Sequence, residues 1–144
     1  NFHLKDSHVI PAMIRKFHEA SIGQKKEVVL WGDGTPLREF TYSRDIAEQL
    51  LFIAENYDDA NPVNLGNSKE ISIKNLAEII ASELNYEGKI VWDTSMPKGQ
   101  HRKPSCKDRV KCLGWKDEDF TTIQTGIKKT CSWFRKNYPN VRGV

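Results

Sequence analysis

The sequence lacks the features that mark secreted, metal-binding and membrane proteins. Its three cysteines, Cys106, Cys112 and Cys131, are odd in number and show no C-x-x-C spacing, so neither a disulfide framework nor a zinc site is predicted. No apolar run approaches the length of a membrane span, and no basic leader precedes an apolar segment. We therefore expect free thiols, no metal, no membrane partner and a cytoplasmic location.

Two glycine-rich nucleotide-binding motifs are also missing. Neither G-x-G-x-x-G nor G-x-x-x-x-G-K-[ST] occurs, so this chain is predicted to hold no cofactor-binding residues. The net charge is only +3, and no dense run of Lys and Arg appears, which argues against nucleic acid as a partner. The chain begins at Asn1, without an initiator Met, and an apolar periodic segment follows almost at once. We expect a piece of a longer protein whose other half holds part of the chemistry.

What the sequence does contain is typical of a small α/β domain. Its 144 residues are 38% hydrophobic and 28% charged, which is enough for one core. The hydrophobic periodicity predicts about four helices alternating with short strands, and a long polar loop at residues 93–104. The expected elements are helices at 9–23, 43–56, 73–84 and from 121 or 122 onward, a short helix at 107–113, and strands at 28–31, 63–66 and 89–92. We expect this domain to occupy residues 1–138 and the tail at 139–144 to be loose.

Capping residues predict where the helices begin, and apolar stripes predict which of their faces are buried. Asp6 or Ser7 is expected to cap the first helix, and Ser43 or Asp45 the second, because their side-chain oxygens can accept from free backbone N–H groups. Ser72 is expected to cap the third. The second helix has an apolar pattern that predicts a well-packed helix, comprising Ile46, Ala47, Leu50, Leu51, Ile53 and Ala54.

The segment at residues 31–45, WGDGTPLREFTYSRD, joins a strand to a helix through a turn. Gly32 and Gly34 permit positive φ in this turn, and the chain alternates again after it, with Arg38 at the expected rim of a sheet. A guanidinium beside flexible backbone suits a phosphate-bearing ligand. The residues alone leave two interpretations open: a phosphate-binding corner, or an ordinary strand–turn–strand with a solvated Arg.

Five segments together resemble a known family. NFHLKDSHVIPAMIRKFHEA, VVLWGDGTPLREFTYSRDIA, VNLGNSKEISIKNLAEIIA, KGQHRK and LGW, in this order, are similar to the carboxy-terminal half of GDP-L-fucose synthases, which are extended short-chain dehydrogenases/reductases. The resemblance implies that this half binds GDP-4-keto-6-deoxy-D-mannose, while an N-terminal Rossmann half binds NADP(H) and carries the reducing residues. It also implies a homodimeric, NADPH-dependent 3,5-epimerase-4-reductase that makes GDP-L-fucose, with this part inactive alone.

The same resemblance implies roles for particular residues. His8, in the Ser7-His8-Val9 motif, is the expected general acid, because the imidazole titrates near neutrality. A diphosphate calls for converging cations, and Trp31 matches a position that contacts substrate. The implied substrate-binding residues are Lys16, Trp31, Arg38, Lys98 and Lys103, with Arg102 in reserve by adjacency.

Two of these positions, His8 and Trp31, also allow a second interpretation, and a third, Lys98, departs from the family pattern. Without the resemblance, His8 reads as a polar residue in the first turn of a helix, and Trp31 as a core aromatic. Lys98 stands where related enzymes carry Asp, and a Lys can only donate hydrogen bonds where an Asp would accept them.

Two other functions remain open at this stage. One is another extended sugar-nucleotide epimerase or dehydratase. The other is a non-catalytic module that binds nucleotide-sugars. A preference for GDP-sugars over UDP- and dTDP-sugars would favour a GDP-L-fucose synthase over another sugar-nucleotide epimerase or dehydratase.

Overall fold

The computed structural model describes residues 1–116, 118 and 120–144. These residues form an α/β fold, which confirms the predicted fold class. The helices are α1 (Val9–Ile22), α2 (Ser43–Asn56), α3 (Ile73–Glu83), α4 (Asp108–Cys112) and α5 (Ile123–Asn137). The strands are β1 (Glu27–Trp31), β2 (Leu37–Glu39), β3 (Glu70–Ser72) and β4 (Lys89–Asp93).

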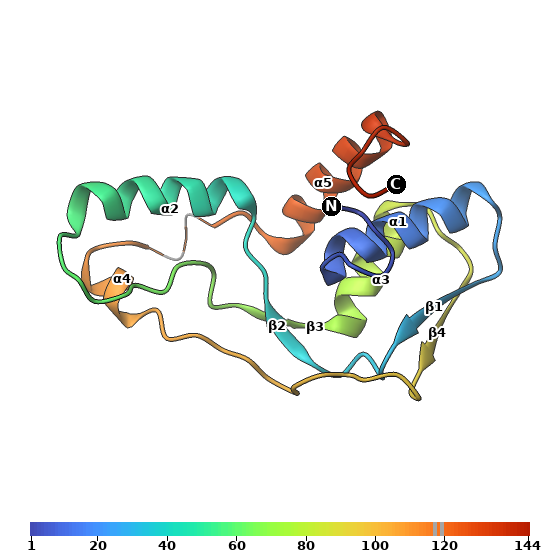
Figure 1. Cartoon of the computed structure of the whole chain (residues 1–144), viewed down its shortest axis with the longest axis horizontal. Helices are drawn as coiled ribbons and strands as arrows, with labels where there is room; N and C mark the ends of the chain where they lie inside the picture. The colour runs from blue at the N-terminus through green and yellow to red at the C-terminus, as the bar shows by residue number, and fades with distance from the viewer. Residues whose placement is uncertain (117, 119) are drawn as a thin grey trace.

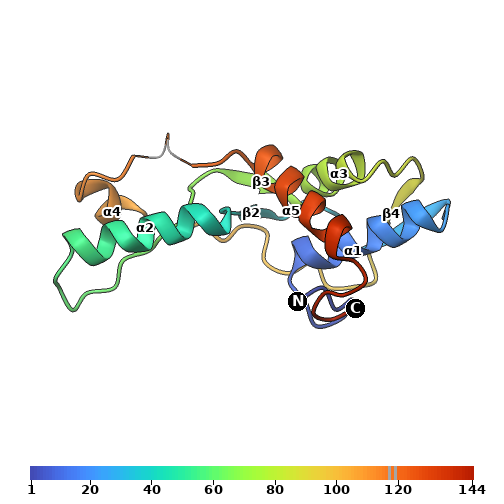
Figure 2. The same cartoon turned by 90° about the horizontal axis from the view of Figure 1, so that it is seen from above.

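The molecule is elongated and has two ends (Figure 1). Helices α1, α3 and α5 pack together at one end with β1 and β4 beside them, whereas α2 and α4 lie at the other end. Strands β2 and β3 run between the two ends, and the view from above shows the same division (Figure 2). The rings of Phe52 and Trp115 meet at 5.3 Å between centroids, which fixes α2 against the segment that follows α4.

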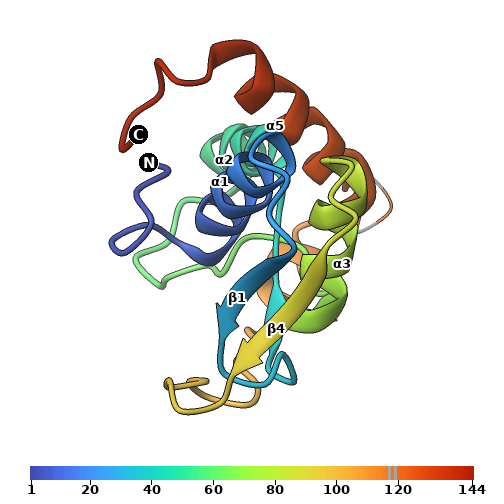
Figure 3. The ribbon, with the colours of Figure 1, turned by 90° about the vertical axis from the view of Figure 1, so that its right-hand side faces the viewer.

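Each sheet in the described part of the chain has two strands. β1 and β4 are parallel, with Val29 opposite Val91 and Trp31 opposite Asp93. β2 and β3 are antiparallel. Because parallel strands end at the same edge, the turn after β1 and the loop after β4 emerge side by side, as Figure 3 shows at the foot of the two arrows.

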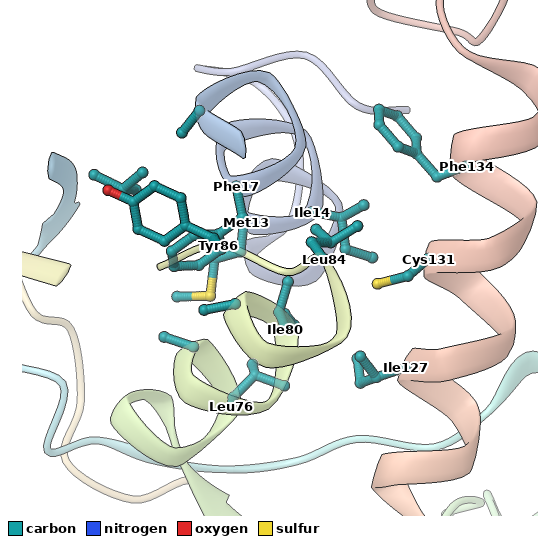
Figure 4. Close-up of a cluster of buried hydrophobic side chains, with 14 of the residues drawn as sticks. Met13, Ile14, Phe17, Leu76, Ile80, Leu84, Tyr86, Ile127, Cys131 and Phe134 are labelled. Carbon is teal, nitrogen blue, oxygen red and sulfur yellow. The ribbon is translucent and has the colours of Figure 1, made fainter. Parts of the chain in front are cut away.

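The core lies where α1, α3 and α5 meet (Figure 4). Each helix contributes apolar residues at helical spacing, because that spacing puts them on one face. The most buried of them are Ile14 and Phe17 from α1, Leu76 and Ile80 from α3, and Cys131 and Phe134 from α5. Burial raises the pKa of the Cys131 thiol to about 12, so this cysteine stays protonated as part of the core.

Two of the expected helix caps are wrong, and one is confirmed. His8 and Tyr42 occupy the N-cap positions of α1 and α2, and neither makes a side-chain cap bond. Asp45 instead accepts hydrogen bonds from the Thr121 backbone N–H at 2.7 Å and from its hydroxyl at 2.8 Å. That buried carboxylate therefore joins α2 to the start of α5. Ser72 caps α3 as expected, and Thr122, at the predicted start of the last helix, caps α5.

The prediction of a well-packed second helix is wrong. Leu50 is 53% exposed and Leu51 67% exposed, and the buried residues of α2 are Asp45 and Gln49. The strand expected at residues 63–66 is also absent from the described structure. No described residue covers the apolar face of α2 that carries Leu50 and Leu51. Segment 63–66 is held by side-chain contacts instead of a strand partner, since the Gly66 N–H donates to the Gln49 side-chain oxygen at 2.6 Å.

The last six residues, expected to be loose, contact the beginning of the chain. Val141 is buried, and the Phe2 backbone N–H donates to the Arg142 carbonyl at 2.7 Å. The Arg15 guanidinium donates to the Gly143 carbonyl at 2.5 Å. The two termini therefore lie together over α1 (Figure 1).

The core assignment predicts unequal effects of one substitution at two helical sites. Ile80→Ala should lower the free energy of unfolding by about 2–5 kcal/mol, because it leaves a cavity between α3 and α5. Ile22→Ala is the matched control, since Ile22 is 66% exposed, and it should cost no more than about 0.5 kcal/mol. Denaturant unfolding measures both. Equal losses would show that the α1–α3–α5 contact is not the core.

Candidate functional site

The turn after β1 and the loop after β4 pack closely. The Gly32 backbone N–H donates to the Asp93 carbonyl at 2.9 Å. Gly32 has φ of +79°, and a Cβ at this position would lie 2.9 Å from the Lys98 Cβ, so both its backbone conformation and its neighbour require glycine. The turn and the basic loop at residues 94–107 thus form a single corner of the molecule.

Arg38 lies at this corner and is held by backbone carbonyls. Its guanidinium donates to the Leu37 carbonyl at 2.6 Å and to the Gln100 carbonyl at 2.8 Å. The Leu37 N–H in turn donates to the His101 carbonyl at 2.8 Å. A guanidinium carries five N–H donors, so these contacts with the described residues leave capacity for a ligand.

Lys98, the departure from the family pattern, pairs with an acid of the turn. Its ammonium lies 3.0 Å from an Asp33 carboxylate oxygen. Asp33 also accepts from the Thr35 hydroxyl at 2.7 Å and from its N–H at 3.0 Å. Hydrogen bonds from Thr35, followed by the one from Lys98, hold the pKa of Asp33 well below its usual value. Lys98 therefore links the loop to the turn in this structure.

Lys16 and Trp31 line one pocket of about 250 Å³. The Lys16 ammonium donates to the Val29 carbonyl at 3.0 Å, and burial lowers its pKa. Trp31 is 55% exposed, so it is not a core aromatic. The other lining residues are Leu4, Lys5, Ser7, Val9, Ala12, Met13, Leu30 and Ile73.

His8 lies at the edge of this pocket. It is an exposed residue between Ser7 and Val9, both of which line the pocket, and its side chain makes no cap bond. The Ser7 hydroxyl donates to the His8 carbonyl at 3.3 Å. Among the described residues the imidazole has no hydrogen-bond partner, so it is available at the N-cap of α1, as a group that transfers protons to an incoming ligand requires.

The basic loop presents one lysine that is not neutralised. Lys103 is exposed and makes no hydrogen bond or ion pair with the residues that the structure describes. Its neighbour Arg102 pairs with Glu70 at 2.7 Å, so the reserve candidate is occupied by an acid. Lys103 is therefore the loop cation that remains available.

The candidate residues fall into two neighbouring groups. Lys16 and Trp31 line the pocket and His8 lies between two lining residues, whereas Arg38, Lys98 and Lys103 belong to the corner. Trp31, the last residue of β1, directly precedes the turn and connects the two groups. The sequence did not predict a role for the acids Asp33, Glu39 and Glu70. Their basic partners are far away in the chain, so the ion pairs become visible only in the folded structure.

The described residues show neither a metal-binding cluster nor a membrane-crossing helix. No group of three or more His, Cys, Asp or Glu side chains is placed to hold a metal ion. None of the helices in the described part is long and apolar enough to cross a membrane.

Comparison with known proteins gives matches along the whole chain. Residues 1–66 match the model of the NAD dependent epimerase/dehydratase family. The chain is 40% identical over 137 residues to probable GDP-L-fucose synthase 1 of Oryza sativa subsp. japonica, covering 95% of this chain and 41% of that protein. It is 37% identical over 152 residues to the GDP-L-fucose synthase of Escherichia coli, covering 99% of this chain and 47% of that protein.

A solved structure has the same fold. The GDP-L-fucose synthetase from Naegleria fowleri bound to NADP superposes with a TM-score of 0.93 at 35% identity, covering 99% of this chain and 44% of that chain. The resemblance to GDP-L-fucose synthases drawn from the sequence is thus confirmed. The chain spans less than half the length of these relatives.

Proposed function

We propose that this chain is the GDP-sugar-binding part of a GDP-L-fucose synthase, an NADPH-dependent enzyme that converts GDP-4-keto-6-deoxy-D-mannose to GDP-L-fucose. The observation that carries the proposal is the corner in which Arg38 is held by the Leu37 and Gln100 carbonyls, while Lys103 of the same loop has no partner among the described residues. Two cations that the strand and its attached loop contribute suit a diphosphate, because charge-assisted hydrogen bonds to phosphate are strong. The similarity to GDP-L-fucose synthases supports this choice of ligand.

In this proposal the nucleotide-sugar extends from the corner into the pocket. Arg38 and Lys103 bind the diphosphate, and Lys16 contributes a third positive charge from the pocket wall. The exposed Trp31 indole covers the sugar or the base. Lys98 keeps its bond to Asp33 and acts through the shape of the corner, since an ammonium cannot accept from a hydroxyl or a base N–H.

His8 serves as the general acid. Epimerisation at C3 and C5 removes protons from carbons that flank the C4 ketone and returns them from the opposite face. This exchange requires an acid and a base on two sides of the sugar. The free imidazole at the start of α1 supplies the acid, and a cysteine outside this chain is its proposed partner.

The described residues do not fit NADP(H). Their sheets have two strands each, and no glycine-rich turn leads from a strand of a larger parallel sheet into a helix. We place the cofactor on an N-terminal Rossmann half and assign no step through it to this chain. Packing of that half on α2 would cover the exposed Leu50 and Leu51. A homodimeric enzyme in the cytoplasm is part of the same proposal.

Nucleotide preference separates this function from the alternatives. Titration calorimetry of the chain with GDP, UDP and dTDP should give the tightest binding for GDP. Equal affinities would favour another extended sugar-nucleotide epimerase or dehydratase. Selective GDP binding in a full-length protein that cannot turn over GDP-4-keto-6-deoxy-D-mannose would favour a non-catalytic module.

Arg38→Ala should weaken GDP binding roughly tenfold or more, because charge-assisted hydrogen bonds contribute about 1.5–3 kcal/mol. The same titration measures this loss. Arg44→Ala removes an equal charge from α2, where Arg44 pairs with Glu48 at 2.9 Å, and should leave the affinity unchanged. Equal dissociation constants for Arg38→Ala and the parent would remove Arg38 from the diphosphate site.

His8→Gln in the full-length enzyme should slow epimerisation roughly 10²- to 10⁴-fold and leave the affinity for the GDP-sugar intact. Deuterium uptake from solvent at C3 and C5, followed by NMR, measures this step. His3→Gln is the control, since the His3 imidazole accepts from the Asp6 N–H at 3.1 Å in a local turn. Unchanged deuterium uptake in His8→Gln would exclude His8 from the mechanism.

A further inference from the structure

Two glutamates face each other across the β2–β3 pair. The antiparallel register places Glu39 directly opposite Glu70. Like charges in directly opposed positions destabilise a strand pair, because their Cβ atoms are only about 4.5–5.5 Å apart. Neutralising both carboxylates removes this destabilisation of the strand pair.

The basic loop neutralises both carboxylates. Arg102 makes a two-oxygen contact with Glu70, with its Nε 2.7 and 3.0 Å from the two carboxylate oxygens. Glu39 accepts from the Ser105 hydroxyl at 2.6 Å and pairs with the Lys107 ammonium at 3.0 Å. Lys107 is only 5% exposed, so this second pair is almost withdrawn from water.

Protonation states agree with this arrangement. Burial by itself would raise the pKa of Glu39, but hydrogen bonds from Ser105 and Lys107 outweigh burial and lower it. The hydrogen bond to Glu70 raises the pKa of Arg102. Glu39 is therefore charged at neutral pH, and each of the two acids fixes one point of the loop.

These two points lie on either side of Lys103. Glu70 holds residue 102, and Glu39 holds residues 105 and 107. Before them in the loop, Arg38 donates to the carbonyl of residue 100, and the Leu37 N–H donates to the carbonyl of residue 101. The loop is thus fixed to β2 and β3 before and after Lys103, which has no acidic partner in the described part of the chain. A loop fixed in advance loses less conformational entropy when it binds a ligand.

We propose that the facing carboxylates Glu39 and Glu70 are positioning residues, which fix the basic loop on β2 and β3 so that Lys103 and Arg38 meet the same nucleotide diphosphate. This inference rests on the proposed GDP-sugar function. Glu39 and Glu70 are negatively charged, as is the diphosphate, and yet in this proposal they strengthen its binding by fixing the loop.

The sign of one mutational effect separates positioning from simple electrostatics. Glu70→Gln removes a negative charge near the diphosphate and keeps the side-chain size, so electrostatics alone predicts tighter GDP binding. Positioning predicts weaker binding, roughly three- to tenfold, because Arg102 loses its charged partner and the loop must be ordered by the ligand. Glu70 is the better test, because Glu39→Gln would leave the buried Lys107 without a charged partner.

The experiment is a calorimetric titration of GDP into four forms of the chain: the parent, Glu70→Gln, Lys103→Ala and the double variant. Glu78→Gln, an exposed acid on α3, is the matched charge control. If Glu70 acts through Lys103, Glu70→Gln weakens binding in the parent and has little further effect once Lys103 is removed. Amide hydrogen exchange should also become faster at residues 98–106 in ligand-free Glu70→Gln, and not in Glu78→Gln.

The possible outcomes differ clearly. Unchanged or tighter GDP binding by Glu70→Gln overturns the positioning role, and so do fully additive effects of the two substitutions. Unchanged exchange at residues 98–106 overturns it as well. A parent chain that binds no GDP refutes the proposed function and the inference together, whereas a parent that binds GDP confines any failure to the inference.

Discussion

The parallel pairing of β1 with β4 is the constraint on which the candidate site depends. It sets Trp31 opposite Asp93, so two segments about sixty residues apart in sequence leave the sheet at the same edge. The Gly32 turn and the basic loop are then close enough for a Cβ on Gly32 to touch Lys98. Without this register, Arg38 and the Gln100 carbonyl that it holds would have no reason to meet.

The corner also depends on how its charges are distributed. The loop and the turn carry several cations, and three of them pair with acids: Lys98 with Asp33, Arg102 with Glu70, and Lys107 with Glu39. The pairs of Lys98 and Arg102 fix geometry more than they add stability, because ion pairs with an exposed partner contribute little net free energy. Lys103 has no acid among the described residues, and the Arg38 guanidinium is held by carbonyls. The acids therefore organise a corner whose remaining positive charge is open to an anion.

The sequence predicted correctly the elements that depend on residues close to one another in the chain. It did not predict the packing and contacts that depend on residues far away in the chain. The helix at Val9–Ile22 and the Ser72 cap follow from periodicity and capping chemistry, and both are observed. The packing of α2 could not be predicted, because an apolar stripe does not reveal what covers it. Of the candidate site, Arg38 at the rim of a sheet could be inferred from the turn alone. Its contact with Gln100 and the facing pair of Glu39 and Glu70 required the strand register.

A crystal structure of the chain with GDP tests the central claim most directly, namely that β1, β2 and the basic loop build a site for a nucleotide diphosphate. The account predicts phosphate oxygens within hydrogen-bonding distance of both the Arg38 guanidinium and the Lys103 ammonium, with Glu70 still bound to Arg102. A diphosphate that reaches neither Arg38 nor Lys103, or that binds at another surface, would contradict it.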